Sequence, residues 1–131
     1  MTEYSNLSMP GIPGRARISW DQIVPSPEEY FGSEDAITAS TTQTQGQQPL
    51  TRRFNRISVC ANASDVVTLP GALAGLTCAV RNDGAQTLQI FPASGDDING
   101  GATDAAITLA AGSTIILGAM DATSWYTFGG A

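Results

Sequence analysis

The stretch LTCAVRNDGAQTLQIFP, residues 76–92, contains two short runs in which apolar and polar residues alternate. Cys78 and Val80 fall on one side of the first run, and Leu88 and Ile90 fall on one side of the second. A period of two places successive side chains on opposite faces of a β-strand. We therefore expect two strands here, each with one buried face.

The sequence Asn-Asp-Gly at 82–84 separates these two runs and is typical of a turn, and we expect Gly84 to take a positive φ in a hairpin there. Similar runs recur every 8–12 residues, which is typical of an antiparallel β-sandwich or jelly roll and not of alternating strands and helices. The fold class that we predict is all-β. The expected strands are Phe54–Ala61, Asp65–Leu69, Leu76–Asn82, Thr87–Pro92, Ala105–Leu109, Ser113–Ala119 and Ser124–Phe128.

The chain of 131 residues divides near residue 54. Residues 1–53 hold five of the seven prolines and a neutral polar run at 38–49, which cannot bury enough apolar surface to offset its ordering entropy. That run is expected to be a linker or an extended strap. We therefore predict an extended N-terminal anchoring arm over 1–53 and a β-sandwich oligomerisation domain over 54–131.

The composition excludes several functions. Charged residues make up 14% of the chain, and six arginines against twelve acidic residues give a net charge of -6 without any lysine or histidine. An acidic chain without lysine is poorly suited to bind phosphates, so we expect no nucleic-acid partner. Histidine is the commonest general acid–base and metal ligand, and the two cysteines lack one as a partner. We therefore expect no enzyme, no metal site and no cofactor.

Three further features bear on location and chemistry. The N-terminus lacks the basic and apolar regions of a secretory signal. The most apolar stretch, 105–120, is interrupted by polar residues and is shorter than the ~20 residues that span a bilayer, so we expect a soluble product of a cytoplasm, without a membrane partner. Cys60 and Cys78 are expected to be two buried thiols, although one bridge stays possible from sequence.

The arm carries aromatic and basic residues that need a surface to bind. Its aromatic residues either fold back onto their own β domain or dock on another protein, and we favour docking because Trp and Tyr are common interface anchors. The basic cluster at 52–56 is either a solvated hinge or a set of partners for carboxylates. The expected partner-binding residues are Arg15, Arg17, Trp20, Ile23, Tyr30, Phe31, Arg52 and Arg53.

The C-terminal part also indicates self-association. Residues 57–131 contain one arginine and six aspartates, most of them in expected turns, and the run 105–120 carries no charge on either strand face. A sheet with one face in water normally shows polar, often charged, outward residues. We therefore expect a homo-oligomer whose β domains pack sheet against sheet around a threefold axis.

The loop 94–104 offers a different kind of site. Its Asp and Asn residues could supply oxygen ligands to Ca²⁺, but their spacing does not match an EF-hand and they are common turn formers, so we favour a structural turn. With the closing strand, the same loop is the candidate site for a host surface glycan. The residues of that alternative are Asp96, Asp97, Asp104, Trp125 and Tyr126.

Turn and core residues spread over about 57–128 resemble a β module of small structural proteins in tailed-bacteriophage virions, of the capsid-decoration or head-fibre type. The resemblance does not include the arm. The matching segments are Asp65–Pro70, Ala74–Gly75, Val80–Ala85, Leu88–Asp96, Ile98–Asn99, Ile107–Ser113 and the strand around Trp125.

The resemblance implies a non-enzymatic, usually trimeric virion protein anchored by its N-terminal segment. The expected function is a decoration or cement protein that is made in the host cytoplasm, lies on the capsid exterior and binds the major capsid protein through its arm. Two alternatives stay open at this point: a head-fibre or tail-tip module that binds host glycans, and a neck or tail adaptor.

Overall fold

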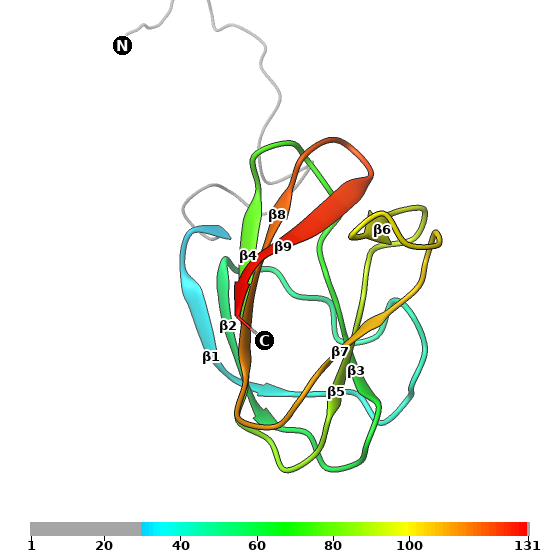
Figure 1. Cartoon of the computed structure of the whole chain (residues 1–131). Helices are drawn as coiled ribbons and strands as arrows, with labels where there is room; N and C mark the ends of the chain where they lie inside the picture. The colour runs from blue at the N-terminus through cyan, green and yellow to red at the C-terminus, as the bar shows by residue number, and fades with distance from the viewer. Residues whose placement is uncertain (1–29, 131) are drawn as a thin grey trace, which may run out of the picture.

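The computed structural model describes residues 30–130, which fold into two β-sheets that face one another (Figure 1). The first sheet has six strands in the order β1-β2-β4-β8-β9-β6, and the second has three in the order β3-β5-β7. The all-β prediction is confirmed. The strands are β1 Ser33–Thr38, β2 Phe54–Val59, β3 Asp65–Thr68, β4 Thr77–Asn82, β5 Leu88–Phe91, β6 Asp97–Ile98, β7 Ile107–Leu109, β8 Thr114–Ala119 and β9 Ser124–Gly130.

All seven expected strands are present, within a few residues of their expected bounds. β1 and β6 are the two strands that the sequence did not indicate. β6 has two residues and lies within the expected loop 94–104, where it pairs with β9. β1 has a single buried side chain, Ile37, so it lacks the alternation by which the other strands were found.

The expectation of antiparallel sheets is wrong for four of the seven strand pairs. β1–β2, β2–β4, β3–β5 and β6–β9 are parallel, whereas β4–β8, β5–β7 and β8–β9 are antiparallel. For two of these pairs the reason is that the chain crosses from one sheet to the other after β2, β3 and β4. β2 and β4, and likewise β3 and β5, are therefore alternate strands along the chain, and each pair runs in the same direction.

The core lies between the two sheets. Ile57, Val80 and Leu117 of the six-stranded sheet and Leu88 and Leu109 of the three-stranded sheet are almost fully buried in one cluster. Fully burying an aliphatic side chain contributes about 1.5–3 kcal/mol relative to leaving it in water. This shared cluster holds the two sheets together.

The predicted boundary after residue 53 does not separate an arm from the β domain. β1 pairs with β2 through Ser33 and Phe54, so the sheet begins at residue 33 and not at the expected residue 54. The segment 39–53 then crosses over the three-stranded sheet, where Ser40 and Pro49 form bridges to β3. The polar run is therefore a strap, as one of the two interpretations held, and it is held against its own domain.

Side-chain amides and one buried carboxylate hold this strap. Gln43 Nε2 donates to Asp65 Oδ1 at 3.0 Å, and Gln45 Nε2 donates to the carbonyl oxygen of Pro92 at 2.8 Å. Asp65 is fully buried and also accepts from the Asn62 backbone N–H at 3.0 Å. These hydrogen bonds, with Gln43 first, lower the pKa of Asp65 below its ordinary value.

The turn at 82–84 is a crossover between the sheets and not a hairpin. The buried Asn82 side chain donates to the carbonyl oxygens of Gln86 and Leu109 and accepts from the Gly84 N–H. Gly84 is not among the residues with positive φ, which corrects that expectation. The turn needs glycine because a Cβ at 84 would overlap the backbone nitrogen of Cys60 and lie 2.5 Å from its Cβ.

Replacing Gly84 with Ala is expected to lower the free energy of unfolding by about 3 kcal/mol, because the new methyl group would push the crossover away from Cys60. Gly71→Ala is the matched control, since a Cβ there meets no atom within 4 Å. Denaturant unfolding of both variants measures the effect. Equal stabilities of the two variants would contradict the close-packing account.

Replacing Asp65 with Asn is expected to destabilise the domain at pH 7, because an amide would turn a donor toward the Asn62 or Gln43 donors. The folded-state pKa of Asp65 is lowered, so its stabilisation is present above its ordinary pKa of about 3.9 and is lost as the pH falls through the folded value. The gap between wild type and D65N should therefore narrow below about pH 4. Unfolding curves from pH 7 to pH 2.5 measure it.

Asp35→Asn serves as the control for that series, because the Asp35 side chain is 87% exposed. We expect a small effect of this change on the free energy of unfolding at every pH. A gap between wild type and D65N that stays constant down to pH 2.5 would contradict the assigned role of the carboxylate.

Candidate functional site

The structure places half of the expected partner-binding residues. Arg15, Arg17, Trp20 and Ile23 lie outside the described residues. Tyr30 is 5% exposed, and its hydroxyl donates to the carbonyl oxygen of Thr77, so it packs on its own domain. Burial raises the pKa of Tyr30 well above its usual range. The expectation that Tyr30 anchors a partner is therefore wrong, because the end of β4 already supplies its contact surface.

The arginines of the basic cluster also have partners within the domain. The Arg52 side chain lies 3.8 Å from the Glu34 carboxylate. Arg53 donates from Nε to Thr77 Oγ1 at 2.8 Å, and its guanidinium lies 5.3 Å from the ring centre of Phe31 and 5.8 Å from that of Phe54. Phe31 itself is exposed. Among the expected partner-binding residues that the structure describes, Phe31 and the Arg53 guanidinium, which lies near the Phe31 and Phe54 rings, remain at the surface.

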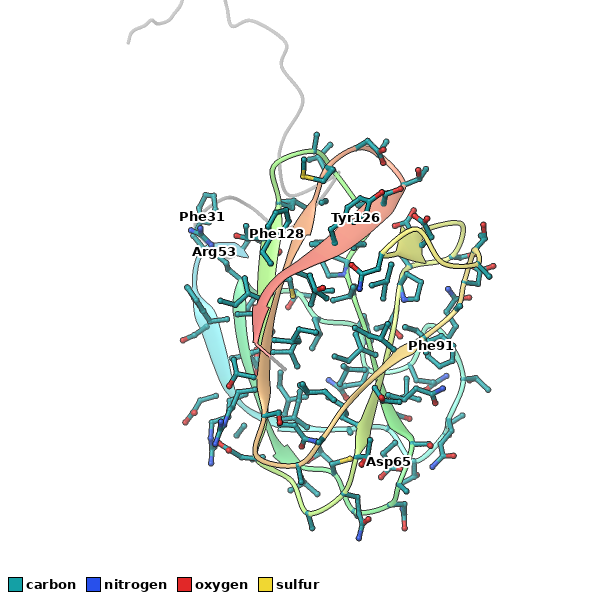
Figure 2. All side chains as sticks on the ribbon, viewed as in Figure 1. Phe31, Arg53, Asp65, Phe91, Tyr126 and Phe128 are labelled. Atoms are coloured by element: carbon teal, nitrogen blue, oxygen red, sulfur yellow. The ribbon has the colours of Figure 1, made fainter. Side chains whose placement is uncertain are left out.

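The residues of the glycan alternative do not form a site. Trp125 is fully buried in the core, so its ring cannot stack on a sugar. Asp96 is buried and accepts from the backbone N–H of Ala72 at 2.8 Å, and Asp104 accepts from Gly95 N–H and from Gln45. Tyr126 is exposed on β9 (Figure 2), and Asp97 is half-buried in the short strand β6. Asp96 and Asp104 thus serve as turn residues.

The two cysteines and the possible metal ligands of residues 30–130 can be placed as follows in the structure. Cys60 and Cys78 are buried and free, which confirms the expectation of two buried thiols. Burial raises the pKa of Cys78 to about 12, so its thiol stays protonated and unreactive near neutral pH. Residues 30–130 bring together no group of three or more His, Cys, Asp or Glu side chains suited to a metal ion. Over the same range, no helix is long and apolar enough to cross a membrane.

The most distinctive surface is the outer face of the six-stranded sheet. Strand register sets Ile116 of β8 beside Ala79 of β4, and Ala79 beside Phe54 of β2. Ile116 is 44% exposed and Phe54 is 53% exposed. This apolar row crosses three neighbouring strands without a charged residue.

The row continues toward β9. Phe128 is 65% exposed, and its ring lies over Gly118, where an added Cβ would be 2.8 Å from the ring. Figure 2 shows Phe31, Arg53 and Phe128 toward the same end of the six-stranded sheet. We call the outer surface of Phe54, Ala79, Ile116, Gly118 and Phe128 the apolar face.

Two hollows flank Phe54 on this face. One, of about 200 Å³, is lined by Arg53, Phe54, Thr77, Ala79 and Ile116. The other, of about 300 Å³, has Phe54 and Ala79 on one side and charged residues of β1, β2 and β4 on the other. The Phe54 ring is therefore a projection between two depressions.

Paired charges border the apolar face. The guanidinium groups of Arg56 and Arg81 each lie 2.7 Å from the Asp83 carboxylate, and Arg56 also lies 3.6 Å from Asp35. Hydrogen bonds from Arg81, and then from Arg56, lower the pKa of Asp83. These arginines and their carboxylates nearly neutralise one another along this border.

The sequence predicts uncharged sheet faces that pack against other copies of the chain, but it does not single out the residues of the apolar face. The signal was present in Ile115-Ile116-Leu117, where a continuous apolar run must turn one side chain outward. For Phe54 and Phe128 the sequence predicts only that they lie in strands. Comparison of the chain with protein-family models, with curated proteins and with solved structures gives no match.

Proposed function

We propose that this chain is a structural virion protein of a tailed bacteriophage: a capsid decoration or cement protein that attaches to the major capsid protein through its N-terminal segment and displays a trimeric β-sandwich on the capsid exterior. The observation that carries the proposal is the apolar face, which residues 30–130 leave uncovered. Soluble proteins rarely leave a contiguous apolar patch in water unless it serves an interaction. The sequence resemblance supplies the virion context.

The chemistry of the described domain also supports a binding role over a catalytic one. Its carboxylates Asp65, Asp96 and Asp104 accept hydrogen bonds from the protein's own backbone or amides. The hollows at Phe54 are open and largely apolar, and their polar borders are paired. A site of this kind offers contact area to another macromolecule and lacks a free acid–base pair for a reaction.

In this proposal the attachment residues are those of the N-terminal segment, with Phe31 at its junction to the domain. Trp20 and Ile23 supply apolar contact, and Arg15 and Arg17 pair with carboxylates of the capsid protein. Arg52 and Arg53 are not assigned to attachment, because they already contact Glu34 and Thr77.

A neck or tail adaptor differs from a decoration protein in the number of copies in each particle.

The double change Trp20→Ala with Ile23→Ala is expected to weaken binding to phage heads at least about 10-fold, because it removes both apolar anchors. The probe is purified heads of the encoding phage that lack the protein, with bound chain measured by co-sedimentation. Tyr4→Ala is the matched control in the same segment and should bind like wild type.

The number of copies on a saturated head is the second readout. Hundreds of copies agree with decoration, whereas tens or fewer would contradict it in favour of a fibre or an adaptor. Wild-type binding by the double variant would contradict the assignment of attachment to the N-terminal segment.

A further inference from the structure

We infer that the apolar face is the contact between copies of this chain, with Phe54 of one copy seated in the hollow beside Phe54 of the next. This inference deepens the proposed function and rests on it only for the existence of an oligomer. It concerns which surface makes that oligomer, and it can be tested without any phage particle.

The shape of the face favours a second copy as the occupant. The Phe54 ring projects, and the adjoining hollow of about 200 Å³ is lined by Phe54 itself, by Ala79 and Ile116, and by Arg53 and Thr77. The guanidinium of Arg53 can lie against an aromatic ring, as it does with Phe31 and Phe54. An apolar cavity of about 150 Å³ takes up benzene, so this hollow has room for a phenyl ring. The projection and the depression that fits it thus lie side by side on one surface.

A surface that carries both a projecting ring and a hollow that fits it can pack against the same surface of another copy. Around a symmetry axis that passes near Phe54, each copy gives its ring to a neighbour and receives one. This exchange of rings is possible around a twofold axis and around a threefold axis. The row from Ile116 to Phe54 then packs against the equivalent row of the neighbour, and both rows leave water.

Charge favours the same occupant. Copies with a net charge of -6 repel one another, so they should approach where negative charge is least. Beside the apolar face, Arg56 and Arg81 pair with Asp83, and Arg56 also pairs with Asp35. Glu34, which lines the larger hollow, lies 3.8 Å from Arg52, and Arg53 adds a positive charge next to the Phe54 ring. These groups together leave no net negative charge there. The other described aspartates lie off this face, in β3, β6 and turns: Asp65, Asp96, Asp97, Asp104 and Asp121.

The test is the mass of the full chain in solution, measured by light scattering during size-exclusion chromatography. Wild type is expected to be an oligomer at about 50 µM. Phe54→Asp and Ile116→Asp should raise the dissociation constant at least about 100-fold, because each sets a carboxylate in the apolar contact. Leu73→Asp is the matched control, since Leu73 is similarly exposed (45%) but lies in the turn before β4, and it should leave the mass unchanged.

Circular dichroism of each variant checks that the sheets are retained, and a cysteine at the centre of the contact gives an independent measurement. In Ala79→Cys, which keeps the Phe54 ring, a short bismaleimide should join two chains, whereas wild type should not react because its two thiols are buried. A monomeric wild type, an oligomer that persists in both Asp variants, or A79C chains that fail to join would each overturn the inference. An oligomer lost in Trp20→Ala but kept in Phe54→Asp would overturn it too.

These outcomes are separable from those of the proposed function. A chain that oligomerises through Phe54 but does not bind phage heads supports the inference and contradicts the decoration role. A dimer in place of a trimer keeps the inference and corrects the expected symmetry. A chain that binds heads as a monomer contradicts the inference and the trimeric form of the proposed function, and keeps the decoration role.

Discussion

The structure depends on one constraint: successive strands from β2 to β5 lie in opposite sheets. The side chains of these strands pack against one another in the core between the two sheets. Ile57 and Val80 of the six-stranded sheet meet Leu88 of the three-stranded sheet in that core. The crossovers stay close because Gly84 packs directly on Cys60 and Asn82 satisfies the turn's backbone. Loosening any crossover would separate the two sheets.

In this arrangement the inner face of each sheet packs in the core, and the outer face of each sheet needs another surface to cover it. The strap at 39–53 runs over the three-stranded sheet and is bridged to β3, so that sheet receives cover from its own chain. The six-stranded sheet has the larger outer face, and Phe54, Ile116 and Phe128 stay exposed on it. The proposed oligomer supplies the cover that the described chain does not.

Alternation of apolar residues was sufficient to predict seven strands, the core positions such as Val80 and Leu88, and the all-β class. Direction within the sheets was not predictable, because Asn-Asp-Gly is equally suited to a hairpin and to a crossover. β1 was not predicted because Ile37 is its single buried residue, so its sequence shows no apolar alternation. Trp125 was placed in a candidate site because a sequence does not tell whether a strand's ring faces the core or the solvent.

The most direct measurement of the central claim is hydroxyl-radical footprinting of the full chain across a concentration series. The account predicts that oxidation of Phe54 and Phe128 falls as the concentration rises, while oxidation of Leu73 in the turn before β4 stays constant. Oxidation of Phe54 and Phe128 at a rate that does not change with concentration, and that matches their exposure in the single chain, would contradict it.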